Sequence, residues 1–379
     1  MDDSAAKTIR EMGFAPAMLI MLQRIEKCLM TEKVNIPGIN ASADDQAAQI
    51  AEDFIFHPYH RHPKRISAMN ELQLQEILLT YFETAKDPVM ARTVFRVIFG
   101  AKTAPHKMDL LFQLVSMAVG IKSSKLLDCA AAWMMYHNLH STECIQLTER
   151  LIDDYCHLIP NAANTLRSLP SVSPSFTSHL ITAFTSLYSF PPVESRPAFP
   201  PSLILDITAE WISSDCTLLL ESCKTPQQQQ QTPDSCVTTA IPGLIHWCIM
   251  SPLLPQQTII DKADSKTSAE YVNNLYSKLH LGVLNSLLTA GKFANGPAAV
   301  VTIGDIAKLV DVVVSVLMTI PNVMTSEIVQ NSLERLAQIL QVTMVTGTIH
   351  TKLANLRKVC ERLPHNPLLN MVLNSENLS

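Results

Sequence analysis

The chain has 379 residues, of which 47% are apolar and 17% are charged, and its formal net charge is −5 at pH 7. The 29 lysines and arginines are scattered, which argues against a nucleic-acid-binding surface, and the low charged fraction favours a protein that buries part of its surface against partners. The longest apolar run, residues 312–320, is about half of a membrane span, and the acidic start lacks an apolar signal segment, so we expect a soluble, intracellular protein without membrane contact.

The cysteines indicate reduced thiols. Nine of them occur at irregular spacings, and no two are arranged as C-x-x-C. An odd number of cysteines without a paired pattern is not typical of a disulfide framework or of a structural zinc site. We therefore expect free cysteines, and neither a metal ion nor another cofactor.

Helical periodicity runs through nearly the whole sequence. Only ten residues are glycine, and long segments carry apolar residues three and four positions apart, which is typical of amphipathic α-helices. Asp87–Pro88 and Ser173–Pro174 each combine an N-cap oxygen with a proline at the first helical position. The sequence predicts helices at residues 15–31, 43–56, 66–86, 88–100, 106–121, 123–137, 142–159, 161–168, 174–189, 202–213, 215–223, 241–253, 268–291, 298–320, 326–346, 351–363 and 366–374.

These helices predict an all-α fold, which we expect to be an α-solenoid. So many helices would overfill a single bundle, whereas antiparallel pairs of the ARM or HEAT type can be stacked without limit. No strict sequence period is visible, so the repeats would be degenerate.

Two polar stretches predict how the chain is divided. Residues 224–239 are rich in glutamine and are bracketed by prolines, which is typical of a flexible loop, and residues 255–268 form a second such stretch. The predicted domains are therefore an N-terminal helical array, residues 1–223, and a C-terminal array, residues 240–379, with the second loop inside it.

The stretch LIDDYCHLIP, residues 151–160, is the densest group of chemically active side chains. In a helix, Asp153 and His157 lie four positions apart on the polar face, whereas Tyr155 and Cys156 are directed towards the core. Neighbouring helical residues project about 100° apart, so Cys156 and His157 are badly placed for a catalytic pair. We interpret the stretch as an ordinary helix.

The same helix has one predicted ion pair and a predicted apolar face. Arg150 and Asp154 are four positions apart, a spacing at which an ion pair contributes about a few tenths of a kcal/mol. The stripe expected to face the core consists of Cys144, Leu147, Leu151, Tyr155 and Leu158.

Histidines gather at two other places. His57, His60 and His62 lie in the segment HPYHRHP, but zinc needs four ligands, and no Cys, Asp or Glu in the segment completes the set. We interpret this segment as a loop between helices. His137 and His140 lie near a helix end, where a cation interacts favourably with the helix dipole.

No motif for catalysis occurs in the sequence. It contains no G-x-x-x-x-G-K-[ST], G-x-G-x-x-G, G-x-S-x-G or H-E-x-x-H pattern, so we predict no catalytic residue and no enzymatic activity. Two alternatives stay open. One is an enzyme whose site is assembled from distant helices, with Asp153, His157 or the 57–62 segment contributing. The other is an RNA-binding helical-repeat protein, which would need a continuous basic face.

Seven stretches taken together resemble one family. They follow one another in the family's order across residues 48–373, and DDYC, LYSKLHL and RLPHN in succession are the most specific of them. On these residues the chain resembles the Integrator complex subunit 15 family. The stretches are NELQLQEILLTYF (70–82), QLVSMAVG (113–120), LIDDYCHLIP (151–160), GLIHWCIMSPL (243–253), LYSKLHLGVL (275–284), SLERLAQILQVTM (332–344) and RLPHNPLL (362–369).

The resemblance implies a non-catalytic, nuclear subunit of a large assembly. Integrator binds RNA polymerase II, cleaves nascent transcripts and processes the 3′ ends of small nuclear RNAs, and the cleavage belongs to a different subunit. The resemblance further implies association with subunits 10, 13 and 14, so that the expected function is a scaffold linking this group to the rest of Integrator. Direct binding of nucleic acid is not expected.

The RLPHN corner, Arg362 to Asn366, is a candidate docking surface. Arg362, Pro364, His365 and Asn366 would lie on a turn between the last two helices, where charged, cyclic and polar groups are close together. The alternative, which we favour, is that Pro364 and Asn366 simply shape that turn, because both residue types are common in turns.

Overall fold

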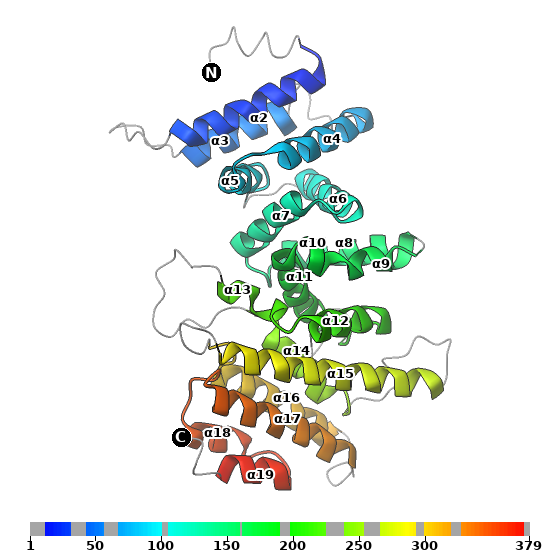
Figure 1. Ribbon diagram of the computed structural model, residues 1–379, viewed down its shortest axis with the longest axis vertical. Coiled ribbons are helices and arrows are strands. Elements are labelled where there is room, and N and C mark those ends of the chain that lie inside the picture. Colours follow the sequence, from blue (N-terminus) through cyan, green and yellow to red (C-terminus); the bar gives the residue numbers. More distant parts are fainter. Residues whose placement is uncertain are drawn as a thin grey trace. The chain divides into compact units, whose positions relative to one another are not determined.

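We describe a computed structural model of the chain, which is helical over most of the residues it describes (Figure 1). The only extended pairing in this part of the chain is an isolated bridge between Val301 and Ile349. The all-α prediction is therefore confirmed. The described residues are 12–31, 43–56, 67–100, 105–159, 161–189, 198–224, 239–253, 266–292, 299–319 and 327–374.

The contacts divide the chain into two compact units. The first comprises Met1–Thr165 and Ser171–Phe176, and the second comprises Leu166–Pro170 and Thr177–Ser379. The loop predicted at 224–239 falls within the sequence of the second unit, and most of it lies outside the described residues, as does most of the stretch 255–268. The domains predicted from the sequence stay a prediction.

In the first unit, successive helices pack in two series. Along one series α2 contacts α4, α4 contacts α6, and α6 contacts α8, while along the other α3 contacts α5 and α5 contacts α7. Contacts between the series include those of α2 with α3 and of α6 with α7. The elements are α2 (Phe14–Thr31), α3 (Ala43–Ile50), η1 (Ala51–Phe56), α4 (Ala68–Thr84), α5 (Pro88–Ile98), α6 (Pro105–Ile121), α7 (Ser124–His137), α8 (Thr142–Ile152) and η2 (Asp153–Leu158).

Aromatic rings fill part of the first unit's core. The ring centroids of Phe82 and Phe95 are 5.3 Å apart, and those of Phe95 and Phe99 are 4.9 Å apart. The indole of Trp133 donates a hydrogen bond of 2.6 Å from Nε1 to the carbonyl of Phe99. A buried indole needs such an acceptor, so this contact fixes α7 against the end of α5.

Both predicted N-caps are confirmed. Asp87 Oδ1 accepts hydrogen bonds from the amides of Val89 and Met90, at 2.8 and 3.3 Å. Ser173 Oγ accepts from the amide of Phe176 at 3.3 Å. These side chains satisfy amides that have no partner within the first helical turn.

Helix α15 is central to the second unit, where it contacts α12, α14 and α17. Helix α17 in turn contacts α14 and α19, and α18 contacts α16 and α19. The sequence boundaries between the two units fall within three successive helices, α9 (Ala163–Arg167), α10 (Leu169–Val172) and α11 (Pro174–Leu187). The remaining elements are α12 (Ser202–Ser214), η3 (Leu218–Leu220), α13 (Glu221–Lys224), α14 (Ile241–Met250), α15 (Lys266–Ala290), α16 (Ile303–Thr319), α17 (Glu327–Thr346), α18 (Leu353–Cys360) and α19 (Pro367–Asn374).

Helix α14 is apolar on nearly every face. Seven of its ten residues are buried, and Trp247 Nε1 donates a 2.6 Å hydrogen bond to the carbonyl of Tyr188. Such a helix must be covered all round by other elements, and in the second unit α15, α16 and α17 all contact it.

Some predicted helix boundaries are wrong. Residues 299–302 are not helical, because Thr302 caps α16 instead: its hydroxyl accepts from the Asp305 amide at 3.1 Å, and Asp305 Oδ2 accepts from the Thr302 amide at 2.9 Å. This reciprocal capping box fixes the helix start. The helix predicted at 215–223 is broken into η3 and α13, and α10 is not predicted at all.

The substitution Gly243→Ala tests how closely α14 approaches α11. An ideal Cβ at Gly243 would lie 2.3 Å from Cβ of Thr185, so one of the two helices would have to shift. We expect the free energy of unfolding to fall by about 1–3 kcal/mol, as measured by urea unfolding followed by circular dichroism.

Gly304→Ala is the matched control. A Cβ at Gly304 would have as its nearest neighbour Thr302 Oγ1, at 3.5 Å, which is an ordinary contact. We expect this variant to be as stable as the wild type or more stable by up to about 1 kcal/mol, because alanine favours a helix. Equal stability of the two variants would contradict the close approach.

Candidate functional site

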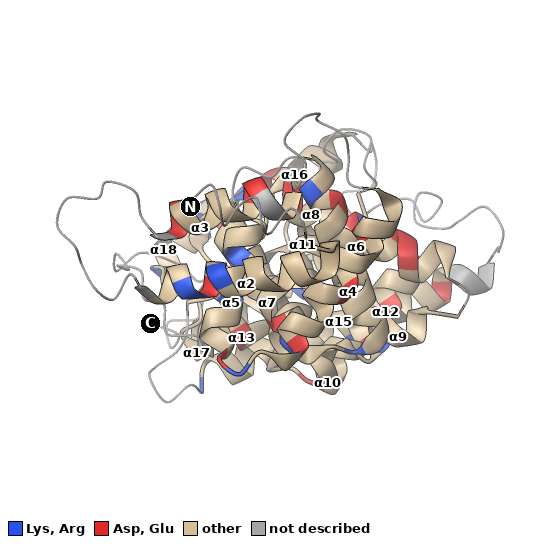
Figure 2. Cartoon of the chain, turned by 90° about the horizontal axis from the view of Figure 1, so that it is seen from above, with Lys and Arg blue, Asp and Glu red and all other residues tan. Residues whose placement is uncertain are grey.

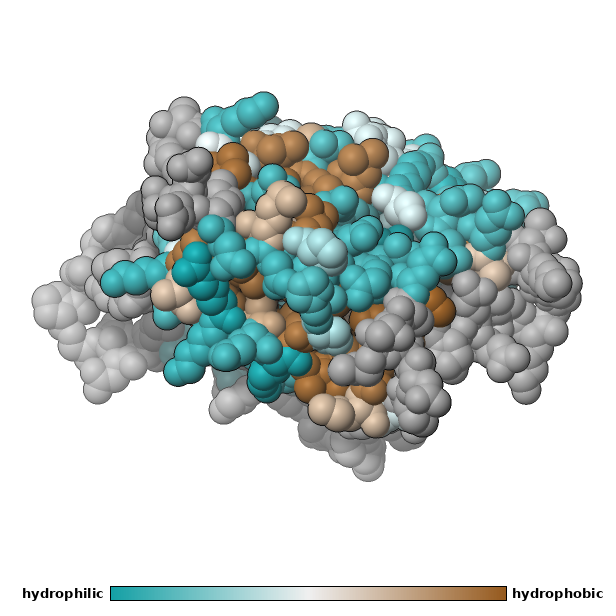
Figure 3. Space-filling view, turned by 90° about the horizontal axis from the view of Figure 1, so that it is seen from below, coloured by the Kyte–Doolittle hydropathy of each residue, from teal (hydrophilic) through white to brown (hydrophobic). Residues whose placement is uncertain are grey.

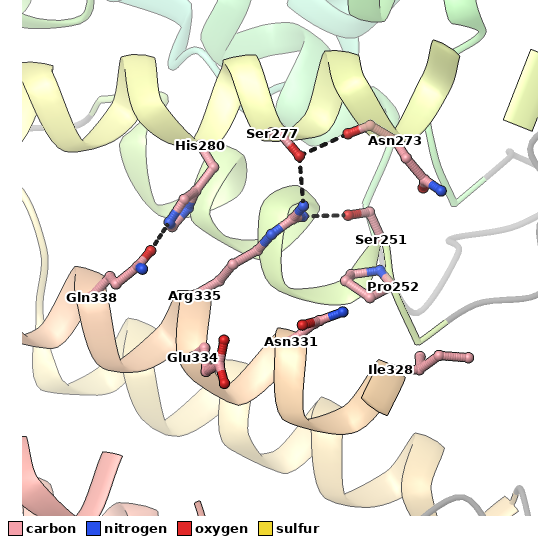
Figure 4. A pocket seen from close by; sticks show the side chains of 10 residues that line it. All are labelled: Ser251, Pro252, Asn273, Ser277, His280, Ile328, Asn331, Glu334, Arg335 and Gln338. Atoms are coloured by element: carbon pink, nitrogen blue, oxygen red, sulfur yellow. Dashed lines mark hydrogen bonds between the residues drawn. The ribbon is translucent and has the colours of Figure 1, made fainter. Parts of the chain in front are cut away.

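A groove in the second unit is the clearest candidate for a binding site (Figure 4). It has a volume of about 630 Å³ and is formed by α15, α17 and the residues that follow α14. This volume is within the usual range for ligand pockets, about 300–1,000 Å³. Its polar side chains include Ser251, Asn273, Ser277, His280, Arg335 and Gln338.

Arg335 reaches from α17 across the groove (Figure 4). Its Nη1 donates to the carbonyl of Cys248 at 2.7 Å and to Ser251 Oγ at 3.0 Å, and its Nη2 donates to Ser277 Oγ at 3.2 Å. Ser332, three residues before it, donates to the carbonyl of Ile249 at 2.7 Å. These two residues of α17 therefore satisfy carbonyls in the last turn of α14, where a cation is also favoured by the helix dipole.

The positive charge of Arg335 meets no carboxylate among the described residues. All three hydrogen-bond acceptors are neutral, and burial lowers the pKa of its guanidinium. Glu334 also lines the groove, but its side chain is exposed and forms no ion pair with Arg335. The groove therefore holds a partly desolvated cation whose counter-charge is not supplied by this part of the chain.

His280 lines the groove as a neutral imidazole. Its Nε2 lies 2.8 Å from Gln338 Oε1, so the tautomer with Nε2–H donates to the amide oxygen, and its buried Nδ1 has no hydrogen-bond partner in the described residues. Burial lowers the pKa of His280, and the nearby charge of Arg335 lowers it further, against the hydrogen bond to Gln338, which raises it. Burial also raises the pKa of the Cys248 thiol to about 12, so this thiol is not an activated nucleophile.

The stretch LIDDYCHLIP does not form a reactive cluster. Asp153 Oδ1 and His157 Nδ1 lie 3.1 Å apart on the surface, where both side chains are about 60% exposed. Tyr155 is buried as predicted, and burial raises the pKa of the Cys156 thiol to about 11. The structure brings Asp153 and His157 together as an exposed hydrogen-bonded pair, and exposed pairs of this kind contribute little to stability.

The predicted ion pair of Arg150 and Asp154 is confirmed, with 3.1 Å between Arg150 Nε and a carboxylate oxygen of Asp154. Asp154 is buried, its carboxylate also accepts from the Ser116 hydroxyl at 2.7 Å, and the Tyr155 hydroxyl donates to the Ser116 carbonyl at 2.6 Å. Leu158, which was expected in the core, is 65% exposed. Leu158 is exposed because η2 is a π-helix, in which each residue turns by a smaller angle about the axis than in an α-helix. The α-helical spacing used for the prediction therefore assigns this residue to the wrong face.

The structure describes the second of the two predicted histidine groups, His137 and His140, but not the first. His57, His60 and His62 lie outside the described residues. Burial lowers the pKa of both His137 and His140, so these side chains are mostly neutral at pH 7. The predicted position at a helix end is confirmed for His137, the last residue of α7, while burial disfavours the charged form of both side chains.

The RLPHN corner is a well-connected turn. Asn366 is 1% exposed, its Oδ1 accepts from the Leu369 amide at 2.8 Å, and its Nδ2 donates to Gln330 Oε1 at 2.8 Å. Arg362 forms an exposed ion pair with Asp311, and the His365 side chain is exposed. Asn366 therefore caps α19 and ties it to α17, while docking at the corner stays a prediction.

Three further observations concern the described residues alone. No group of three or more His, Cys, Asp or Glu side chains there is arranged to hold a metal ion. None of the helices there has the length and apolar character needed to span a bilayer. The eight cysteines in this part of the chain are not joined by disulfide bonds.

Asp154→Asn tests the buried carboxylate. The substitution removes the charge that Arg150 and Ser116 approach, so we expect the free energy of unfolding to fall by about 1.5–3 kcal/mol in urea unfolding. Asp153→Asn is the matched control, since it removes an exposed carboxylate next to it and is expected to cost less than about 1 kcal/mol. Similar losses in the two variants would contradict the assignment.

The pH dependence of stability tests His280. The unfolded chain binds a proton at the ordinary pKa of about 6.5, whereas the native pKa of His280 is lower. Below about pH 6.5 the unfolded state therefore binds more protons than the native state does, so the free energy of unfolding decreases as the pH is lowered. We expect His280→Gln to lose less stability than the wild type between about pH 7.5 and about pH 5.5 in urea unfolding. Identical losses would contradict the low pKa.

Comparison with known proteins places the chain in a family. The family model described as Integrator complex subunit 15 matches residues 4–365. A relative of that name from Danio rerio is 34% identical over 89% of this chain and 73% of its own length. The Homo sapiens relative is 32% identical over 87% and 78%, and the Drosophila melanogaster relative is 26% identical over 93% and 94%. This chain belongs to the Integrator complex subunit 15 family.

Proposed function

We propose that this chain is a non-catalytic scaffold subunit of the Integrator complex. The observation that carries the proposal is the family match over residues 4–365, together with relatives from vertebrates and an insect that are all named as Integrator subunits. The match spans both compact units, so it is not confined to one module.

The proposal includes an α-solenoid of ARM or HEAT type. The two series of contacts in the first unit support it, because helices contact the next helix of their own series, and α2 with α3 and α6 with α7 contact each other between the series. Stacked pairs of this kind provide extended surfaces on which other proteins bind.

Exposed apolar side chains support a docking function. In the second unit Met318, Val345 and Met371 are exposed by 79, 63 and 68%. On the face drawn in Figure 3, apolar groups lie in patches between hydrophilic ones. Exposed apolar patches are typical of protein–protein interfaces.

The finer proposal concerns partners and process. We infer that the chain acts in the nucleus, associates with subunits 10, 13 and 14, and supports small nuclear RNA 3′-end processing and the regulation of transcription by RNA polymerase II. It does so without a catalytic site of its own and without direct contact to RNA. In Figure 2, the few Lys and Arg residues are interspersed with Asp and Glu, which does not favour a continuous basic surface.

Affinity purification of the tagged chain from nuclear extract tests the proposal. The eluate is separated by size exclusion and identified by mass spectrometry, and we expect Integrator subunits to be recovered, led by 10, 13 and 14. A second bait, Arg362→Ala with His365→Ala, assigns the RLPHN corner: loss of partners from a folded variant indicates docking there, and unchanged recovery indicates a turn. Elution of the wild-type chain as a monomer without these subunits would contradict the scaffold function.

A further inference from the structure

We propose that the Arg335 groove binds the carboxylate side chain of an Asp or Glu residue on another Integrator subunit. This inference rests on the proposed function, since it assumes that the chain is assembled with such subunits. It assigns a specific chemistry to one place on the second unit, between the end of α14, α15 and α17 (Figure 4).

The first step of the argument is the unused donor capacity of Arg335. A guanidinium group has five N–H donors in a fixed planar arrangement. Within the described residues, Nη1 donates to Cys248 and Ser251, and Nη2 donates once, to Ser277. This leaves Nε–H and one N–H of Nη2, two atoms on the same edge of the guanidinium, which is the edge that binds the two oxygens of a carboxylate.

The second step is the missing counter-charge. A cation that is withdrawn from water and surrounded by neutral acceptors is destabilised until an anion approaches it. Glu334 does not fill this position, because neighbouring residues of a helix project about 100° apart and its side chain is exposed. A partner's carboxylate would restore the charge balance while the three existing hydrogen bonds continue to hold the guanidinium in place.

The third step concerns the class of ligand. The rest of the groove is polar and almost uncharged: Asn273, Asn331 and Gln338 offer amides, and His280 is neutral. A nucleic-acid strand would require several cations along its phosphates, whereas Arg335 is the one Lys or Arg among the residues that line the groove. One acidic side chain on a protein segment fits this arrangement, and neighbouring peptide groups can bind the amides.

Zero-length crosslinking with a carbodiimide tests the proposal in the assembled complex. Arg335→Lys keeps the positive charge and supplies an amine that couples to a carboxylate in contact with it. We expect the tagged variant, purified with Integrator, to give a crosslink from position 335 to an Asp or Glu of another subunit. Gln341→Lys, at an exposed position of α17 that does not line the groove, is the control and should not couple to that residue.

A second lysine variant tests the groove in case Arg335→Lys does not fold. Asn331→Lys places an amine in the groove without removing Arg335, and it should couple to the same segment of the partner. Arg335→Gln should weaken recovery of that partner on the order of tenfold or more, while Glu334→Gln should not weaken it.

The outcomes separate this inference from the proposed function. If the complex is recovered but positions 335 and 331 give no crosslink to another subunit, the inference is wrong and the scaffold function stands. A crosslink from position 335 only to a carboxylate of the same chain, such as Asp261 or Asp264, would overturn it as well. Failure of the wild-type chain to recover Integrator subunits would instead count against the proposed function.

Discussion

The second unit depends on how the carbonyl groups at the end of α14 are satisfied. This helix is apolar on nearly every face and is contacted by three other helices, so its last carbonyls have little access to water. Arg335 and Ser332 of α17 donate to them, and Arg335 continues to Ser277 of α15. One arginine thus joins three helices. Because the described groups that hold it are all neutral, its charge stays available to an external carboxylate.

Much of the fold could be predicted from the sequence because the helices are set by local signals. The spacing of apolar residues predicted nearly all the described helices. Hydrogen bonds to the side chains of Asp87 and Ser173 confirm the two predicted N-caps. Two local features were missed. The Thr302–Asp305 capping box is present in the sequence as T-x-x-D and could have been found. The π-helix Asp153–Leu158 includes Asp154, which bonds to Ser116 of α6, a contact between residues far apart in the sequence.

The candidate groove could not be predicted for a different reason. Arg335 is 84–87 residues from its partners on and after α14, and nothing in the segment SLERLAQILQVTM indicates that one arginine points across a groove. The family resemblance was more informative about function than any single residue was. The quoted stretches lie between residues 70 and 369, and the family match covers residues 4–365. Few charges and many buried apolar residues are consistent with a protein that binds others.

The central claim is that this chain works by docking its helical surfaces onto other Integrator subunits. Amide hydrogen exchange, measured on the free chain and on the chain within purified Integrator, tests it most directly. The account predicts slower exchange in the complex for the segments that line the Arg335 groove, at the start of α17, along α15 and after α14. Equal exchange of every segment in the two states would contradict the claim.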